Sequence, residues 1–283
     1  TVVFDQAATG TYSGVISGSG SLVKQGAGVI NFTNDSSGFF FVSVNVNAGT
    51  LLLDGRLGGT FTIAANAVLK GRGTAVGDVI NNGSLQPGDP IDILNIDGNS
   101  MQMASEELIS AGGTLNIEGN YTQTASGELV IEINELGVTD LLEITGTATL
   151  DGALQVHPDP GFYSEGTVYT FLTADGIIER TDPNVLTADT PTVNGEFSSD
   201  SSSYPVDYTI QYLPNEVRLL ILSDSLITPP PPPDKLIFRD RPKGNAGAVE
   251  DYLFCSSVDF SETDINKVAK ALLALPTDQY IKA

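Results

Sequence analysis

Glycine-x-leucine triplets recur between residues 20 and 154, and six of them stand where a turn leads into a short strand. A glycine accepts the positive φ of a tight corner, and the leucine two places later faces the same side of an alternating strand. Such corners predict stacked short strands, each burying its apolar face against its neighbours. A β-sandwich is the alternative, but Asn82-Gly83 is the clearest of few two-residue hairpin signals. These six triplets are Gly20-Ser21-Leu22, Gly49-Thr50-Leu51, Gly83-Ser84-Leu85, Gly113-Thr114-Leu115, Gly127-Glu128-Leu129 and Gly152-Ala153-Leu154.

The sequence predicts an all-β region up to about residue 157 and antiparallel strands from there to residue 226. In the second part, Pro214-Asn215 predicts a hairpin turn, and the composition of residues 182–204 predicts a surface loop. In the first part, residues 101–109 are expected to form an inserted loop or short helix between strands. Asn81 and other asparagines fall at corners, where their side chains can bond the neighbouring backbone. The expected strands are 21–24, 28–32, 39–46, 50–53, 61–64, 67–70, 129–133, 147–150, 168–172, 207–213 and 216–222.

The charge is strongly acidic, with 35 Asp and Glu against 13 Lys and Arg. No Lys or Arg occurs between Arg72 and Arg180. Nucleic acids and anionic membranes need a basic surface, so the sequence argues against both as partners. We interpret the acid excess as a solvated surface rather than a Ca²⁺ site, because calcium-binding repeats are absent.

The single cysteine, Cys255, and the first residue, Thr1, bear on where in the cell the chain could reside. One cysteine cannot form an internal disulfide, which fits an exported chain and a cytosolic one equally well. No apolar run approaches the roughly 18 residues of a membrane helix, and Thr1 stands in place of an initiator methionine. We therefore expect either a soluble chain or an excised fragment of a longer protein, and the missing methionine favours a fragment.

The five prolines Pro229–Pro233 mark a linker over residues 227–244. A proline run is a stiff extended spacer, and its other interpretation is a ligand for an SH3-type domain. The basic residues that follow are too few for a nucleic-acid patch and are read as solvated linker charge; they are Lys235, Arg239, Arg241 and Lys243.

The last segment, residues 245–283, changes to a helical period. One apolar stripe formed by Ile265, Val268, Leu272 and Leu275 predicts a helix that Pro276 ends. A shorter helix is expected over residues 246–254. Neither helix indicates a cofactor or metal site.

Catalytic chemistry is not indicated, and we expect no catalytic, cofactor-binding or metal-binding residues. A Ser-His-Asp set requires a histidine, and the only one, His157, is expected in a turn after the strand ending at Val156. Zinc sites built of His and Cys are excluded by count, and Cys255 has no nearby histidine to activate it. Paired carboxylates such as Asp89 with Asp92 or Glu106 with Glu107 leave a carbohydrate-active enzyme, a lyase or glycosidase, as the alternative function.

Residues 69–88, Leu-Lys-Gly-Arg-Gly-Thr-Ala-Val-Gly-Asp-Val-Ile-Asn-Asn-Gly-Ser-Leu-Gln-Pro-Gly, resemble the end of the passenger in classical autotransporters, the type V secretion family. Its pattern is close to L-x-G-x-G-T-V-x-G-x-V-x-N-x-G-x-L-x-P-G. The likeness continues at residues 113–123, 126–133, 140–152 and 169–174, and covers roughly residues 49–175. Residues 95–111 depart from the pattern by adding about one coil.

The resemblance implies a right-handed parallel β-helix with an antiparallel C-terminal cap, then a proline-rich linker and a short α-helical tail. Residues 1–112 would be passenger coils, residues 113–226 the last coils and an autochaperone cap, and residues 245–283 the stretch before an absent β-barrel. The implied function is a non-enzymatic, surface-exposed passenger that supports an upstream adhesin or effector; a plain adhesive module is a third possibility. The implied partners are the chain's own β-barrel and the outer-membrane assembly machinery. The implied location is the bacterial cell surface, with release as an option.

Overall fold

The computed structural model describes residues 1–37, 43–88, 112–176 and 192–228. Residues 1–230 form one compact unit and residues 231–283 another, so every described residue belongs to the first unit. The regular elements in these ranges are all β-strands, which confirms the expected all-β class for this part of the chain. The proline run, the basic residues after it, both expected helices and the 101–109 segment lie outside the described residues.

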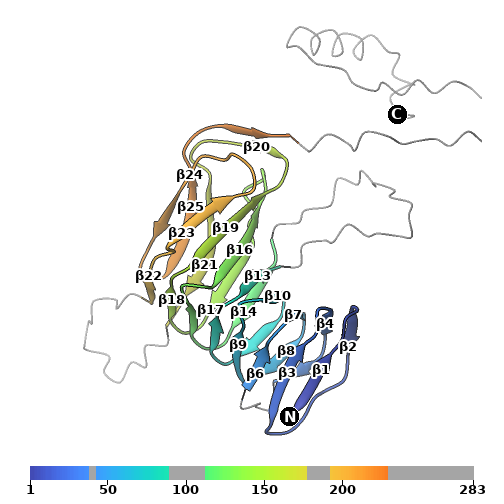
Figure 1. The fold of residues 1–283 in the computed structure, drawn as a ribbon. Coiled ribbons are helices and arrows are strands. Elements are labelled where there is room, and N and C mark those ends of the chain that lie inside the picture. Colours follow the sequence, from blue (N-terminus) through green and yellow to red (C-terminus); the bar gives the residue numbers. More distant parts are fainter. Residues whose placement is uncertain (38–42, 89–111, 177–191, 229–283) are drawn as a thin grey trace, which may run out of the picture. The chain divides into compact units, whose positions relative to one another are not determined.

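Three sheets of eight strands each build the unit (Figure 1). The first sheet runs β1 (Val2–Asp5), β3 (Ser21–Gln25), β6 (Ser43–Val46), β9 (Thr60–Ile63), β12 (Val79–Asn81), β15 (Tyr121–Gln123), β18 (Ala148–Leu150) and β22 (Val193–Gly195). The second runs β2 (Gly10–Tyr12), β4 (Val29–Phe32), β7 (Gly49–Leu53), β10 (Ala67–Gly71), β13 (Ser84–Pro87), β16 (Glu128–Ile133), β19 (Ala153–Pro158) and β23 (Ser199–Ser202). The third runs β5 (Asp35–Ser36), β8 (Arg56–Gly58), β11 (Thr74–Val76), β14 (Thr114–Ile117), β17 (Leu141–Ile144), β21 (Val168–Ala174), β25 (Glu216–Ile221) and β24 (Tyr208–Tyr212).

From β3 to β19 the chain visits the three sheets in rotation, and we call one such circuit a rung. Each strand pairs in parallel with the strand of the same sheet in the next rung, so Val44 lies beside Phe61 and Phe61 beside Val79. Stacked parallel strands account for nearly all of the pairing between β1 and β19. The sandwich alternative is therefore wrong, because hairpin-connected neighbours would pair in antiparallel fashion.

The leucines of all six glycine-x-leucine triplets are fully buried, as expected. Leu51, Leu69 and Leu85 lie directly beside one another on successive strands of the second sheet. The same row continues through Leu129 and Leu154. Each leucine is thus buried by the rungs on either side of it, which makes the core continuous along the stack.

The triplet glycines serve a different purpose from the expected one at most positions. Positive φ occurs at Gly49 and Gly152, both at +66°, and at none of the other four. At Gly83 a Cβ would lie 2.1 Å from the carbonyl oxygen of Ala64 in the neighbouring rung. At Gly127 it would lie 2.4 Å from that of Asn81. Close approach of adjacent backbones, rather than a left-handed corner, excludes a side chain there.

Antiparallel strands occur at the C-terminal end of the unit. β21 pairs in parallel with β17 and in antiparallel fashion with β25, which pairs in turn with β24. The predicted turn at Pro214-Asn215 is confirmed, since the Leu213 N–H donates to the Glu216 carbonyl at 2.9 Å. A separate antiparallel ribbon joins β20 (Gly161–Tyr163) to β26 (Ser225–Ile227).

The expected surface loop over residues 182–204 is wrong for its described part, residues 192–204. β22 extends the first sheet beside β18, and β23 extends the second sheet beside β19. The strand Ser199–Ser202 has no apolar alternation to reveal it. Its strand conformation therefore depends on backbone hydrogen bonds to the edge of β19 that β16 does not occupy.

Candidate functional site

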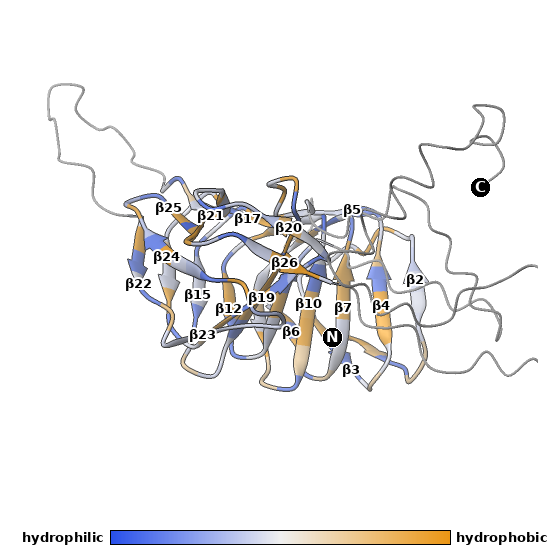
Figure 2. Cartoon of the chain, turned by 90° about the horizontal axis from the view of Figure 1, so that it is seen from above, coloured by the Kyte–Doolittle hydropathy of each residue, from blue (hydrophilic) through white to orange (hydrophobic). Residues whose placement is uncertain are grey.

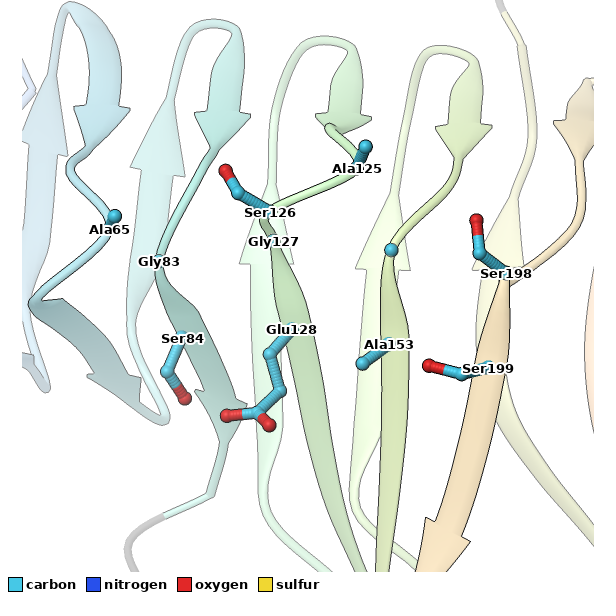
Figure 3. Close-up of a pocket in the computed structure, with 11 residues that line it drawn as sticks. Ala65, Gly83, Ser84, Ala125, Ser126, Gly127, Glu128, Ala153, Ser198 and Ser199 are labelled. Carbon is cyan, nitrogen blue, oxygen red and sulfur yellow. The ribbon is translucent and has the colours of Figure 1, made fainter.

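A shallow groove crosses the outer surface of the second sheet near the starts of β13, β16, β19 and β23 (Figure 3). Ser84, Glu128, Ala153 and Ser199 follow one another across these strands in register. The groove has a volume of about 260 Å³. Its lining is Ala65, Gly83, Ser84, Ala125, Ser126, Gly127, Glu128, Gly152, Ala153, Ser198 and Ser199.

The groove is hollow because its corners hold glycines that the packing of the rungs requires. A Cβ on Gly152 would lie 2.2 Å from the carbonyl oxygen of Gly127, and Gly83 and Gly127 are equally confined. Small residues here are therefore explained by the stacking itself.

Three polar side chains of the groove are hydrogen-bonded within the protein. Glu128 accepts a hydrogen bond from the Gln155 amide, and the Ser198 hydroxyl bonds Asp151. The Ser126 hydroxyl donates to the Asn82 carbonyl at 3.1 Å. Glu128 is the one ionisable residue among the lining residues, so the groove offers no carboxylate pair, histidine or cysteine.

His157 lies within β19 and not in a turn, which corrects the expectation. Its strand stays paired with β16 through Pro158, so that Glu132 lies opposite His157 on the outer face. The alternation of β19 leaves His157 half-buried between the inward-facing Val156 and Pro158. β19 pairs in parallel with β16 at all six positions, and this pairing carries the strand past Val156, where the His-Pro sequence predicted its end.

Asp140 is a buried carboxyl that sequence reasoning did not single out. Its Oδ1 accepts hydrogen bonds from the N–H groups of Gly112 and Gly113 at 3.1 and 2.9 Å. Its Oδ2 accepts one from the N–H of Glu132 at 3.1 Å. Burial raises the pKa of Asp140 to about 7, although the backbone hydrogen bonds act to lower it. The only signal in the sequence was its position directly before the strand Leu141–Ile144.

A second buried polar group fills the corner between the first and second sheets. Asn81 donates from Nδ2 to the Tyr121 hydroxyl at 3.1 Å and to the Glu128 carbonyl at 2.9 Å, and its Oδ1 accepts from the Gly83 N–H. The Tyr121 hydroxyl donates to Gln123, whose amide bonds three backbone carbonyls. Burial raises the pKa of Tyr121 above its ordinary value. The prediction that Asn81 bonds backbone at a corner is confirmed, and the role of the network is structural.

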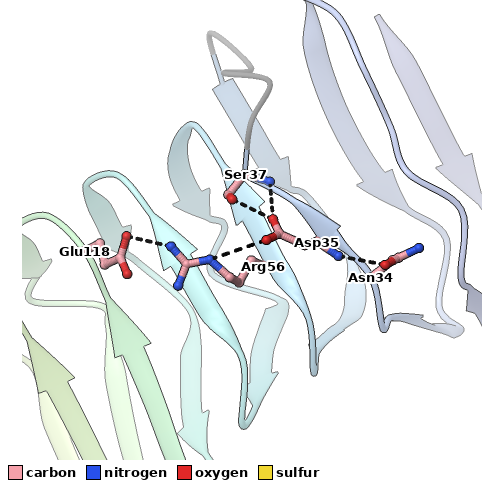
Figure 4. Close-up of polar contacts among 5 residues, drawn as sticks. All are labelled: Asn34, Asp35, Ser37, Arg56 and Glu118. Carbon is pink, nitrogen blue, oxygen red and sulfur yellow. Dashed lines mark hydrogen bonds and ion pairs between the residues drawn. The ribbon is translucent and has the colours of Figure 1, made fainter.

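Arg56 on β8 contacts acidic residues of two other rungs on the outside of the third sheet, Asp35 on β5 and Glu118 directly after β14 (Figure 4). Its Nη2 lies 2.9 Å from Glu118 and its Nε 3.9 Å from Asp35. Hydrogen bonds from Ser37 lower the pKa of Asp35, and the hydrogen bond to Glu118 raises the pKa of Arg56. These groups are exposed, so the ion pairs add little stability.

The carboxylate pairs Asp89 with Asp92 and Glu106 with Glu107, and the cysteine Cys255, lie outside the described residues. Across the described ranges, no group of three or more His, Cys, Asp or Glu side chains is placed to hold a metal ion. The same ranges contain no helix that is long and apolar enough to cross a membrane.

Comparison with known proteins assigns no family. No protein-family model matches the chain, and no curated protein matches it. The residues themselves and the resemblance that they carry are therefore the basis for any functional assignment.

Proposed function

We propose that this chain is part of the passenger of a classical autotransporter, a non-enzymatic protein displayed on the bacterial cell surface. The observation that supports it most is the placement of residues 69–88, the stretch most similar to that family. Leu69 and Leu85 are buried in the second sheet, Ala75 in the third and Val79 in the first. Gly71 and Gly77 have φ of +130° and +139°, and a Cβ on either would collide with a backbone carbonyl of the preceding rung. The positions that carry the resemblance thus coincide with the corner and core positions of one rung.

The finer architecture in this proposal is a right-handed parallel β-helix closed by an antiparallel cap. The rotation of the chain through three sheets and the parallel pairing of successive rungs support the helix. The antiparallel strands β24, β25 and β26 at the C-terminal end support the cap. A proline-rich linker over residues 227–244 and a helical segment over residues 245–283 would then lead to the β-barrel.

Residues 113–226 would act as the folding nucleus during secretion and support an adhesive or effector region upstream. A stack can grow by adding each new rung to a finished neighbour. A chain whose C-terminal part emerges first during export can therefore fold without a nucleotide cofactor. The partners in this proposal are the chain's own barrel and the outer-membrane assembly machinery.

Surface display tests the proposal. Residues 1–283 are placed between a secretion signal and an autotransporter β-barrel in a Gram-negative host, and protease is added to intact cells. We expect display of the chain and a protease-resistant core. Removal of residues 113–226 should abolish the resistant core, whereas removal of residues 1–48, as a control, should leave it. Equal resistance after removal of residues 113–226 would contradict the proposal.

A further inference from the structure

Large apolar side chains are exposed together near the C-terminal end of the stack. Phe162 is 48% exposed, Leu226 70% and Leu136 72%. Phe162 and Leu226 lie directly opposite each other on the ribbon of β20 and β26, where Figure 2 shows the apolar colour of β26. We call Phe162 and Leu226 the apolar ribbon surface; Leu136 lies on a separate turn.

The surface is held in place from beneath. Tyr163, the neighbour of Phe162, is fully buried, and its hydroxyl donates to the carbonyls of Ile133 and Asp159 at 2.9 and 2.8 Å. The Phe162 N–H also donates to Glu135 Oε2 at 2.8 Å, which connects the ribbon to the turn that carries Leu136. The exposure of the surface is therefore a property of an anchored element and not of a loose end.

The surroundings of the surface are acidic. Glu135 and Asp159 lie close enough to raise the pKa of Tyr163, after the larger effect of burial. Asp224 lies beside the ribbon and accepts a hydrogen bond from the Glu165 N–H at 2.8 Å. Over residues 112–176 and 192–228 the sole Lys or Arg is Arg218, which bonds Gln211 and Glu216 on the third sheet. The apolar centre is thus rimmed by negative charge.

We propose that the apolar ribbon surface binds a cationic amphipathic segment of a partner protein. Apolar side chains of that segment would cover Phe162 and Leu226, and its Lys or Arg residues would face Glu135, Asp159 and Asp224. Contiguous exposed apolar residues with a polar rim mark interaction sites, unlike single exposed ones. A second copy of the chain would bring a like-charged rim, and nucleic acids and anionic membranes would be repelled.

Binding of a defined peptide to the full chain tests the proposal. The probe is a fluorescent synthetic helix of leucine and lysine, measured by anisotropy, with a leucine and glutamate helix as the charge control. We expect the double variant Phe162→Ser, Leu226→Ser to weaken binding of the cationic peptide at least tenfold. The variant Ile80→Ser, which removes an apolar residue 37% exposed in the first sheet, should leave binding unchanged.

Each other outcome contradicts the proposal. Equal binding by the double variant and by Ile80→Ser would mean that net charge alone attracts the peptide. Equal binding of the glutamate helix would remove the role of the acidic rim. If the wild-type chain forms concentration-dependent dimers that the double variant does not form, the surface binds a second copy. If the wild-type chain binds zwitterionic vesicles through this surface, it binds lipid.

Discussion

Asp140 couples the stability of the stack to pH. Its folded-state pKa of about 7 exceeds the ordinary value of 3.8, so the folded chain binds more protons than the unfolded chain between those values. The free energy of unfolding therefore falls as the pH rises through that window, because ionisation leaves a charge in a buried position. We expect Asp140→Asn to reduce the rise in thermal midpoint that the wild type shows between pH 8 and pH 5.

The control for Asp140→Asn is Asp78→Asn, which removes one negative charge from an exposed position. That control accounts for the general relief of repulsion in a chain with a net charge of −22. If both variants keep the pH dependence of the wild type, Asp140 does not titrate as inferred. Circular dichroism melts at the two pH values give the comparison.

Lys24 stabilises a corner of the N-terminal rungs. It is fully buried, and its Nζ donates to the carbonyls of Gln25, Gly26 and Ala48 at 2.9, 2.7 and 3.0 Å. Burial lowers the pKa of Lys24, but the three acceptors remain within hydrogen-bond reach. We expect Lys24→Met to lower the free energy of unfolding by about 2–4 kcal/mol, because the carbonyls lose their donor.

Lys24→Gln should restore part of that stability. Gln123 stands in the same row of the first sheet and bonds three corner carbonyls with its amide. Urea unfolding compares the variants, and hydrogen exchange at the amides of β3 and β6 shows whether the loss is local. Equal stability of Lys24→Met and wild type would show that the ammonium contributes nothing.

At the scale of elements, the close approach of neighbouring rungs at a corner between sheets determines which residues a triplet glycine can be replaced by. We expect Gly83→Ala to lower the free energy of unfolding by about 1–3 kcal/mol, since its Cβ would collide with the Ala64 carbonyl and force the backbone to move. Gly20→Ala is the matched control, because the nearest atom to its Cβ would be 3.5 Å away. It should change stability by less than about 0.5 kcal/mol. Equal losses in chemical unfolding would contradict the steric account.

Strands with alternating apolar residues were predictable, and strands set only by their neighbours were not. The alternation in Leu129–Ile133 predicted β16 closely. Three-residue strands of the third sheet, such as Arg56–Gly58 and Thr74–Val76, show too few residues to display a period. Their conformation follows from pairing with the strands of adjacent rungs, which is information that lies about 20 residues away in the sequence.

The candidate site was less predictable than the fold. Sequence reasoning placed Asn81 correctly at a corner but missed Asp140, because its burial depends on Gly112 and Gly113 from the preceding rung. His157 was misplaced because the proline after it suggested a turn, whereas pairing with β16 as far as Pro158 keeps it in a strand. Contacts between rungs decided both cases.

For the whole molecule, stability should be greatest toward the C-terminal end. We expect residues 113–226 expressed alone to fold cooperatively and resist protease, since β25 and β24 complete the C-terminal end of the third sheet and β20 pairs with β26 there. Residues 1–112 alone should stay largely unfolded, because β13 and β11 lose the partner strands β16 and β14. Circular dichroism and limited proteolysis of the two fragments decide the matter. A folded N-terminal half beside an unfolded C-terminal half would contradict the prediction.

The rotation through three sheets has a consequence for how such a chain can change in evolution. Residues 38–42, 89–111 and 177–191 each fall between a strand of one sheet and a strand of the next. Strand register is set by the neighbouring rungs, so a longer connection adds only loop-closure entropy, about 0.6 kcal/mol for each doubling of its length. New exposed segments can therefore be inserted at the corners while the pairing of every strand, and with it the buried leucine row, stays the same.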